Sequence, residues 1–313
     1  MMSNQPVILL TGSRGMVGQN ILSHPEASSY TWLTPSKLEL NLNELHSVKD
    51  YFKKFRPDAV IHAAGKVGGI QDNIANPVRF LVDNLDMGLN LIMTAREANI
   101  KTFLNLASSC IYPKDAKNPL TENMILEGSL EPTNEGYALA KIAALKLCEY
   151  INKEDQSQHF KTLIPCNLYG RFDKFDPKHS HLVPAIIHKI HNAKVGNDKT
   201  VTIWGDGLAR REFMDASDLA HIILQSLKDF ERLPSVMNVG VGYDYTINEY
   251  YKIAAEVIDW HGEFIHDKTK PAGMLKKLVS IDRMKALGFK ATTTLKEGML
   301  NAYAFYLEYH HEH

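Results

Sequence analysis

Two residues four positions apart, Tyr137 and Lys141, could together move a proton at a carbonyl group. On a helix this spacing places both side chains on one face, one turn apart. A phenol titrates far above neutral pH, and a neighbouring ammonium ion favours its phenolate, as does the positive nicotinamide ring of an oxidised cofactor. Tyr137 could then exchange a proton with a carbonyl oxygen while hydride moves at its carbon. Ser108 or Ser109, after a predicted strand, could hydrogen-bond the same oxygen.

A glycine-rich segment gives this pair a context. Gly12, Gly15 and Gly18 follow a predicted strand and open a predicted helix with the spacing G-x-x-G-x-x-G. Glycines at such a junction allow a tight turn and let a pyrophosphate approach the helix N-terminus. The spacing departs from G-x-G-x-x-G, so a turn that serves packing alone remains an alternative. We expect this loop to bind a dinucleotide through Gly12, Ser13, Arg14, Gly15, Met16, Val17 and Gly18.

The residues after the second predicted strand favour NADP over NAD. An acidic residue there would hold the ribose 2′-hydroxyl of NAD. The chain instead reads Leu33-Thr-Pro-Ser-Lys37, in which Ser36 and Lys37 could meet a 2′-phosphate. Arg14 in the glycine loop could add a second positive contact. The alternative is that Lys37 is a solvated surface charge.

Predicted strands and helices alternate through the first half of the chain. Because alternating strands and helices form parallel sheets covered on both faces, we expect an α/β fold, a Rossmann-type doubly wound sheet. Ligands of such sheets bind beyond the carboxyl ends of the strands. The predicted strands are 6–10, 30–33, 58–62, 101–106 and 161–165, and the main predicted helices are 43–55, 77–99 and 137–152.

The alternation breaks after about Tyr169. Residues 171–181 are polar and irregular, 184–193 read as a helix and 201–204 as a short strand, and 237–240 read as a strand that returns to the main sheet. We therefore expect residues 1–168 to form an NADP-binding Rossmann domain, with late strands returning near 201–240. Residues 169–313 would mainly form a smaller C-terminal α/β domain that binds the substrate.

Composition excludes several classes of protein. The 313 residues carry 35 Lys and Arg against 36 Asp and Glu, a net charge of −1, so no charge excess favours a nucleic acid or an anionic membrane. No apolar run is long enough to span a membrane, and the polar N-terminus does not resemble a signal peptide. Three cysteines fit a reducing compartment, and we expect a cytoplasmic location. We expect no metal site.

Longer motifs carry a family resemblance. Ser-Ser-Cys-Ile-Tyr-Pro and Ser-His-x-x-Pro-Ala are far more specific than the cofactor motifs. With them the chain resembles the GDP-L-fucose synthase family, which belongs to the extended short-chain dehydrogenase/reductases. The resemblance implies NADPH-dependent reduction of the C4 ketone of a GDP-4-keto-6-deoxy sugar, with epimerisation at C3 and C5. The matching segments are Gly12–Gly18, Lys66–Ile70, Ser108–Pro113, Tyr137–Ile142, Asn167–Gly170, Ser180–Ala185 and Arg211–Phe213.

The resemblance also assigns roles to residues. It makes Cys110 and His181 the acid/base pair of epimerisation, since the C4 ketone acidifies the C–H bonds at C3 and C5 and both side chains titrate near neutrality. Taken alone, Cys110 would read as a buried small residue and His181 as a loop histidine. The implied GDP-binding residues are Lys189, Trp204 and Arg211, and the remaining cofactor positions are Lys37, Ala63, Leu106, Ala107, Ser108, Tyr137, Lys141, Pro165, Asn167, Leu168 and His181.

Several alternatives stay open. Lys189 could be a solvated helix residue, Trp204 a core residue, and Arg210 the phosphate partner in place of Arg211. Ser280 stands where the family usually has a substrate-contacting Asp, with Asp282 two residues later. The resemblance therefore extends to reductases of GDP-4-keto-6-deoxy-heptoses in capsule sugar synthesis, some of which only reduce C4. A redox-neutral NAD-dependent nucleotide-sugar epimerase and a non-catalytic dinucleotide sensor are the other readings.

The predicted helix from Tyr137 to Ile151 is apolar nearly all round. One face can cover the sheet, and the other is most simply buried against the same helix of a second copy. We therefore expect a homodimer. The alternative is burial under another segment of the same chain.

Overall fold

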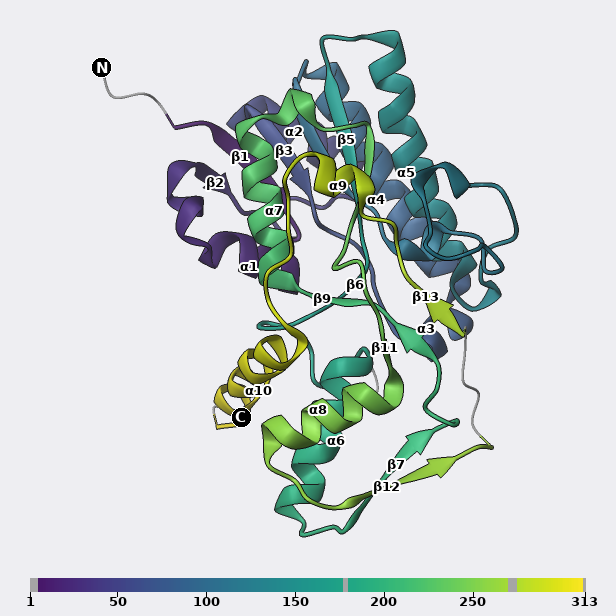
Figure 1. Cartoon of the computed structure of the whole chain (residues 1–313). Coiled ribbons are helices and arrows are strands. Elements are labelled where there is room, and N and C mark those ends of the chain that lie inside the picture. Colours follow the sequence, from purple (N-terminus) through teal and green to yellow (C-terminus); the bar gives the residue numbers. More distant parts are fainter. Residues whose placement is uncertain (1–4, 177–179, 270–274, 312–313) are drawn as a thin grey trace.

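The computed structural model describes residues 5–176, 180–269 and 275–311 (Figure 1). Its centre is a six-stranded parallel sheet in the order β10-β5-β4-β3-β1-β2, which confirms the predicted Rossmann-type fold. The chain runs from β1 to β2 on one side and then adds the later strands on the other, so the order reverses beside β1. The strands are β1 (Val7–Thr11), β2 (Thr31–Leu33), β3 (Ala59–His62), β4 (Thr102–Leu106), β5 (His159–Pro165) and β10 (Val236–Val239).

Helices cover both faces of this sheet (Figure 1). On one face Leu9, Val60, Phe103 and Phe160 pack against helix residues such as Leu91 in one buried cluster. The opposite face carries a second cluster. The helices over the first face are α2 (Leu45–Phe55), α4 (Pro77–Glu97) and α5 (Glu135–Glu154), and those over the second are α1 (Met16–Ser23) and α7 (Ala216–Lys228).

The second half of the chain contains a core of its own, built around Val183, Ile187, Tyr250 and Met299. The expected strand near 237 returns to the main sheet as β10, beside β5. The expected strand near 201 does not join the main sheet. It forms β7 (Thr200–Trp204), which pairs in parallel with β12 (Glu263–Asp267) outside the main sheet. The helices of this part are α6 (Leu182–Val195), α8 (Ile247–Ile258) and α10 (Leu295–His311).

Short strands outside the six-stranded sheet pair segments that are far apart in sequence. β8 (Arg210–Arg211) lies between β11 (Tyr245–Thr246) and β13 (Lys276–Lys277), and β6 (Asn167–Tyr169) pairs with β9 (Phe213–Asp215). The remaining helical segments are α3 (Ile70–Ala75), α9 (Asp282–Ala286) and the 3-10 turns η1 (Pro25–Ser29), η2 (Ser109–Ile111), η3 (Glu122–Met124), η4 (Pro132–Asn134) and η5 (Phe230–Arg232).

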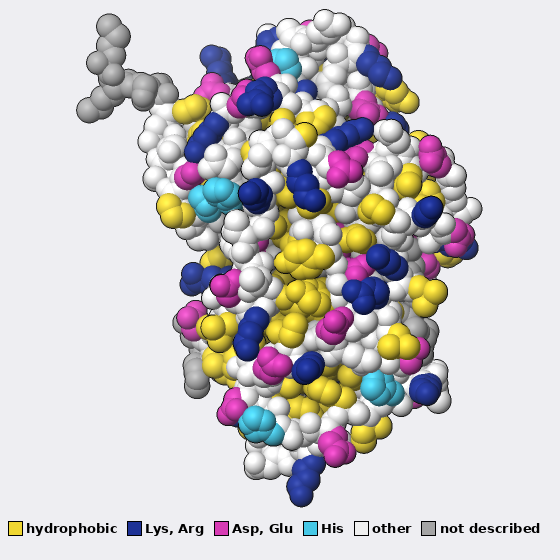
Figure 2. Space-filling model, viewed as in Figure 1, with side chains coloured by type: hydrophobic (Ala, Val, Ile, Leu, Met, Phe, Trp, Pro, Cys, Tyr) yellow, Lys and Arg dark blue, Asp and Glu magenta, His cyan; other side chains and the backbone are white. Residues whose placement is uncertain are grey.

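The apolarity of the helices and the distribution of surface charge can be read from the structure. Within the described residues, no helix combines the length and the apolarity that crossing a membrane would need. Figure 2 shows lysines and arginines interspersed with aspartates and glutamates over the viewed face, around apolar side chains along its middle.

Candidate active site

The expected cofactor residues follow the carboxyl ends of adjacent strands. Gly12 follows β1, Ala63 follows β3, Ala107 follows β4, and Asn167 begins β6 directly after β5. Because β1, β3, β4 and β5 are consecutive neighbours in a parallel sheet, these positions share one edge. The fold therefore places them where a dinucleotide would cross the sheet.

The three glycines of the loop differ in their surroundings: Gly12 and Gly18 are closely packed, whereas Gly15 is more open. Gly12 has a φ of +74°, and a Cβ there would lie 2.6 Å from the backbone of Ala63. A Cβ on Gly18 would lie 2.4 Å from the carbonyl oxygen of Gly12. A Cβ on Gly15, by contrast, would meet only the carbonyl oxygen of Gly12, at 3.3 Å. Gly15 is the N-cap residue of α1, and no side chain forms a capping hydrogen bond there. The N-terminal amides of α1 are thus left for an anion, as a pyrophosphate requires.

The two cations expected at a 2′-phosphate, Arg14 and Lys37, are both exposed. Sequence reasoning missed a carboxylate beside them. Glu39 Oε2 accepts a hydrogen bond from the backbone nitrogen of Ser36 at 2.7 Å. Arg14 contributes to holding the pKa of Glu39 below its usual range, after the bonds from Ser36. The expected 2′-phosphate site therefore contains a carboxylate, Glu39, as well as the cations Arg14 and Lys37.

The two adjacent serines after β4 are distinguished by burial. Ser109 is only 2% exposed, whereas Ser108 is partly exposed and precedes η2. The backbone nitrogen of Cys110 donates to Ser108 Oγ at 3.5 Å. Of the two candidates, Ser108 is the more accessible to a ligand.

Tyr137 and Lys141 face each other on α5. The Lys141 Nζ lies 5.7 Å from the centroid of the Tyr137 ring and donates to the carbonyl oxygen of Leu106 at 2.9 Å. Burial lowers the pKa of Lys141 to about 8. Burial also raises the pKa of Tyr137, a direction opposite to the expected shift toward the phenolate. The protonated phenol is the form that donates a proton during reduction.

Cys110 lies close enough to Tyr137 and Lys141 to interact with both electrostatically. Burial raises the pKa of its thiol, and the strongest opposing charge is Lys277 on β13. Sequence reasoning missed Lys277, which belongs to a segment far along the chain. Because an ammonium ion favours a nearby thiolate, Lys277 can help Cys110 to exchange a proton.

His181 occupies the N-cap position of α6 and is exposed, although the surrounding protein lowers the pKa of its imidazole. Among the described residues, no hydrogen bond joins it to Cys110. His62, which sequence reasoning treated as structural, is buried and bonds Thr11 Oγ1 through Nδ1 at 2.9 Å. Burial, helped by the charge of Lys141, lowers the pKa of His62 to about 3, so it stays neutral beside that ammonium.

The expected GDP-binding residues lie in the second half. Lys189 Nζ donates to the carbonyl oxygen of Thr202 at 2.8 Å, which ties α6 to β7. Trp204 at the end of β7 is 62% exposed, which excludes the core-packing alternative. Arg210 is held by Asp244 through its Nε, and its NH2 donates to the Asp244 carbonyl at 2.8 Å. Arg210 is thus engaged by a carboxylate, and Arg211 NH1 donates to the carbonyl oxygen of Arg210 at 2.8 Å.

Ser280 stands at the position of the family's usual aspartate. It is 7% exposed, and its hydroxyl donates to Asp282 Oδ2 at 2.8 Å. The backbone nitrogen of Ser280 donates to the carbonyl oxygen of Leu120 at 2.8 Å. Ser280 and Asp282 are thus bonded to each other where α9 begins.

Comparison with known proteins decides the family. The model of the NAD dependent epimerase/dehydratase family matches residues 8–240. This chain belongs to that family. It is 51% identical over 300 residues to a GDP-L-colitose synthase of Yersinia pseudotuberculosis, covering 96% of this chain and 97% of that protein. It is 48% identical over 300 residues to a GDP-L-fucose synthase of Azorhizobium caulinodans, covering 96% of each. The expected relationship to GDP-L-fucose synthases is thereby confirmed.

Solved structures agree with this epimerase/dehydratase family assignment. A GDP-mannoheptose C4 reductase from Campylobacter jejuni with NADP bound superimposes with a TM-score of 0.89 at 28% identity, covering 98% of this chain and 100% of that one. A GDP-6-OMe-4-keto-L-xylo-heptose reductase from C. jejuni gives 0.90 at 26% identity, covering 100% and 99%. The similarity extends over both halves of the chain. The role of each individual site residue remains a prediction.

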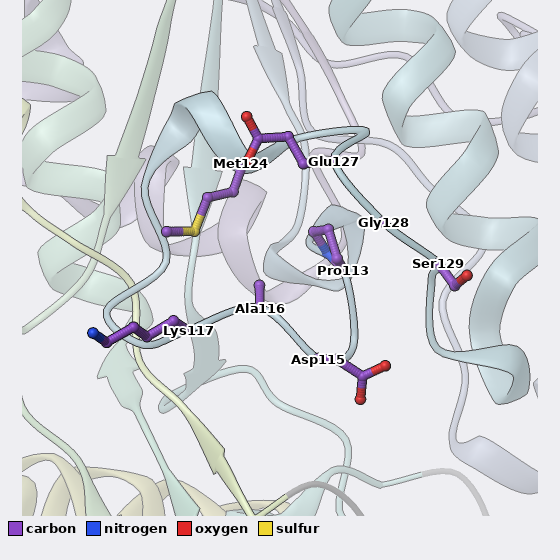
Figure 3. A pocket seen from close by; sticks show the side chains of 8 residues that line it. All are labelled: Pro113, Asp115, Ala116, Lys117, Met124, Glu127, Gly128 and Ser129. Atoms are coloured by element: carbon purple, nitrogen blue, oxygen red, sulfur yellow. The ribbon is translucent and has the colours of Figure 1, made fainter.

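The cavities found elsewhere are distinct from this family site. One, of about 230 Å³, is lined entirely by the loop after η2, from Pro113 to Ser129 (Figure 3). Another lies where α3 meets α4, beside Val78 and Val82. Neither includes Ser108, Cys110 or a residue of the glycine loop.

Proposed function

We propose that this protein catalyses NADPH-dependent reduction of the C4 ketone of a GDP-4-keto-6-deoxy sugar, together with epimerisation at C3 and C5. One observation carries the proposal: Tyr137, Lys141 and Cys110 lie together at the carboxyl edge of the sheet. The proposal is supported by relatives at 48–51% identity that are named GDP-L-fucose and GDP-L-colitose synthase.

The residues present fit a dinucleotide. The open N-terminus of α1 at Gly15 suits a pyrophosphate, and the exposed Arg14 and Lys37 suit the 2′-phosphate of NADP. NADP is bound in a related GDP-mannoheptose C4 reductase. NADPH, when bound, supplies the hydride that reduces C4, and Lys141 would hold the ribose hydroxyls.

The reduction step uses the protonated Tyr137. Since burial keeps this phenol protonated, it can donate a proton to the C4 oxygen as negative charge develops there. Ser108, which precedes η2, would donate a hydrogen bond to the same oxygen. Tyr137 is held by α5, and Ser108 lies between β4 and η2.

Epimerisation needs a second pair of groups. One removes a proton next to the ketone and the other returns a proton to the opposite face, while Ser108 and Tyr137 stabilise the enolate oxygen. Cys110 and His181 fill these roles in the proposal. Lys277 assists because its charge favours the thiolate of Cys110.

The identity of the sugar has two candidates. A second candidate comes from the 51% identity to a protein named GDP-L-colitose synthase: a substrate that lacks the 3-hydroxyl group, because L-colitose differs from L-fucose in that group. Such a substrate has no stereocentre at C3, so only C5 would be epimerised. The two activities are separated by offering GDP-4-keto-6-deoxymannose and GDP-4-keto-3,6-dideoxymannose to the same preparation and comparing kcat/KM.

We also propose a homodimer. α4 packs beside α5 within the chain, which accounts for part of the apolar surface of α5. Apolar side chains nevertheless remain exposed on both helices, with Val82 at 43% and Leu139 at 42%. Their neighbours at helical spacing are exposed as well, so a second copy would cover a face rather than a point. These neighbours are Val78, Leu89 and Tyr150.

The activity fits a cytoplasmic enzyme, since Cys110, Cys148 and Cys166 are all free and buried. The direct test is the stoichiometry of NADPH oxidation. One NADPH consumed for each GDP-4-keto sugar converted supports the reductase, and conversion without NADPH oxidation would instead indicate a redox-neutral epimerase.

A further inference from the structure

Glu212 is a buried carboxylate that the reaction does not use. It lies between β8 and β9 and is 1% exposed. Among the described residues no lysine or arginine forms an ion pair with it. Its oxygens instead accept three backbone hydrogen bonds: Oε1 from Val241 at 2.8 Å and Gly242 at 2.9 Å, and Oε2 from Val279 at 2.9 Å.

These bonds join three segments that are far apart in sequence. Glu212 follows Arg211 directly, Val241 follows β10 at the edge of the main sheet, and Val279 lies two residues beyond Lys277. The backbone nitrogen of Glu212 also donates to the carbonyl oxygen of Lys277 at 3.3 Å. Both the side chain and the backbone of Glu212 therefore hold the β13 segment in place.

The surroundings are shaped to this carboxylate. A Cβ on Gly240 would lie 2.4 Å from Glu212 Oε1, so any larger residue there would have to displace this carboxylate. The three backbone N–H groups need an acceptor at both ends of the side chain. A carboxylate offers two acceptor oxygens, whereas glutamine presents an NH2 group in place of one oxygen. The amide nitrogen would then face a backbone N–H, donor against donor.

We propose that Glu212 is a positioning residue that assembles the sugar-nucleotide side of the active site. It holds the β13 segment against β8, so that Lys277 stands beside Arg211 and within electrostatic reach of Cys110. This inference rests on the proposed function for its substrate, but the placement of Lys277 can be tested without any substrate.

The test compares Glu212→Gln with Asp218→Asn, a matched control. Asp218 is likewise buried and accepts backbone hydrogen bonds, from Thr292 and Thr293 at 3.0 Å each, but it ties α7 to the segment before α10. Glu212→Gln should raise the KM for the GDP-4-keto sugar about tenfold or more while the KM for NADPH changes little. Asp218→Asn should change neither KM, although both variants lower Tm.

A second readout needs no turnover. The pH midpoint for iodoacetamide alkylation of Cys110, followed by peptide mass spectrometry, should rise in Glu212→Gln because Lys277 is displaced. Should Glu212→Gln not fold, Gly240→Ala perturbs the same carboxylate and should give both shifts. An unchanged KM and an unchanged alkylation midpoint, with only Tm lowered, would overturn the proposal. An alkylation shift in a protein that turns over no GDP-4-keto sugar would support the positioning role and refute the proposed function.

Discussion

Lys277 is paired in register with Arg211 across the β13–β8 ladder, which places two cations from distant segments side by side. The same Lys277 is the strongest charge that lowers the pKa of the Cys110 thiol against the effect of burial. The β13–β8 ladder thus links Arg211, which is expected at the phosphates, with the surroundings of Cys110, which is expected to move protons.

Replacing Lys277 with Met should therefore slow epimerisation more than reduction. Without the ammonium ion the thiol of Cys110 is harder to ionise, and we expect epimerisation to fall by about tenfold or more. Exchange of the C3 and C5 hydrogens with solvent, measured by NMR, reports this step. Lys276→Met is the control, since Lys276 pairs with Asp244 at 3.2 Å instead. Equal losses in the two variants would argue against a role for the Lys277 charge.

The two serines after β4 should respond differently to alanine. Ser108→Ala removes a donor to the C4 oxygen and should lower kcat by about 10²-fold, the loss typical of one such donor. Ser109 is buried at 2% exposure, so Ser109→Ala should change thermal stability with kcat nearly intact. Steady-state kinetics and thermal melts of both variants check this. A larger kcat loss in Ser109→Ala would reverse the assignment.

The reduction rate should depend on pH through Lys141. Burial lowers its pKa to about 8, and the protonated ammonium donates stronger, charge-assisted hydrogen bonds to the ribose hydroxyls than the neutral amine does. As the pH rises through about 8 the ammonium is lost, so kcat/KM should fall with increasing pH. A Lys141→Met variant should be much less active and should lack this limb of the pH profile. A wild-type profile that stays level to pH 10 would contradict the expectation.

The exposed apolar residues of α4 and α5 should mediate the dimer. Leu139→Asp together with Val82→Asp should shift the protein to a monomer in light scattering at micromolar concentration, since two charges would have to be buried. Leu300→Asp is the control, because Leu300 is 55% exposed on α10, away from these helices. A wild-type monomer, or a dimer that survives the double substitution, would rule out this interface.

The sequence predicts the sheet well and the second half less well, for a physical reason. Buried parallel strands such as 6–10 are continuous apolar runs, and a glycine loop at a strand–helix junction has a local signature. β8 and β13 are only two residues each, and nothing local says that they pair. Lys277 and Glu212 gain their importance only from that pairing. Both were therefore missed, and the strand near 201 was assigned to the wrong sheet.

Electrostatics could not be read from spacing alone either. The Tyr137–Lys141 spacing indicates a proton-transfer pair, but it does not give the depth of burial. In the structure burial raises the pKa of Tyr137, and the neighbouring Cys110 acts in the same direction. Glu212 illustrates a competition, since burial raises its pKa to about 7 although three backbone N–H groups favour the charged form.

If one site both epimerises and reduces a GDP-4-keto sugar, solvent hydrogen must enter the product during reduction. We would convert GDP-4-keto-6-deoxymannose with NADPH in deuterated water. We expect one NADPH oxidised per product and deuterium at C3 and C5, with the label lost in Cys110→Ser and His181→Asn. Stoichiometric reduction to an unlabelled product would contradict this expectation, and would leave a plain C4 reductase.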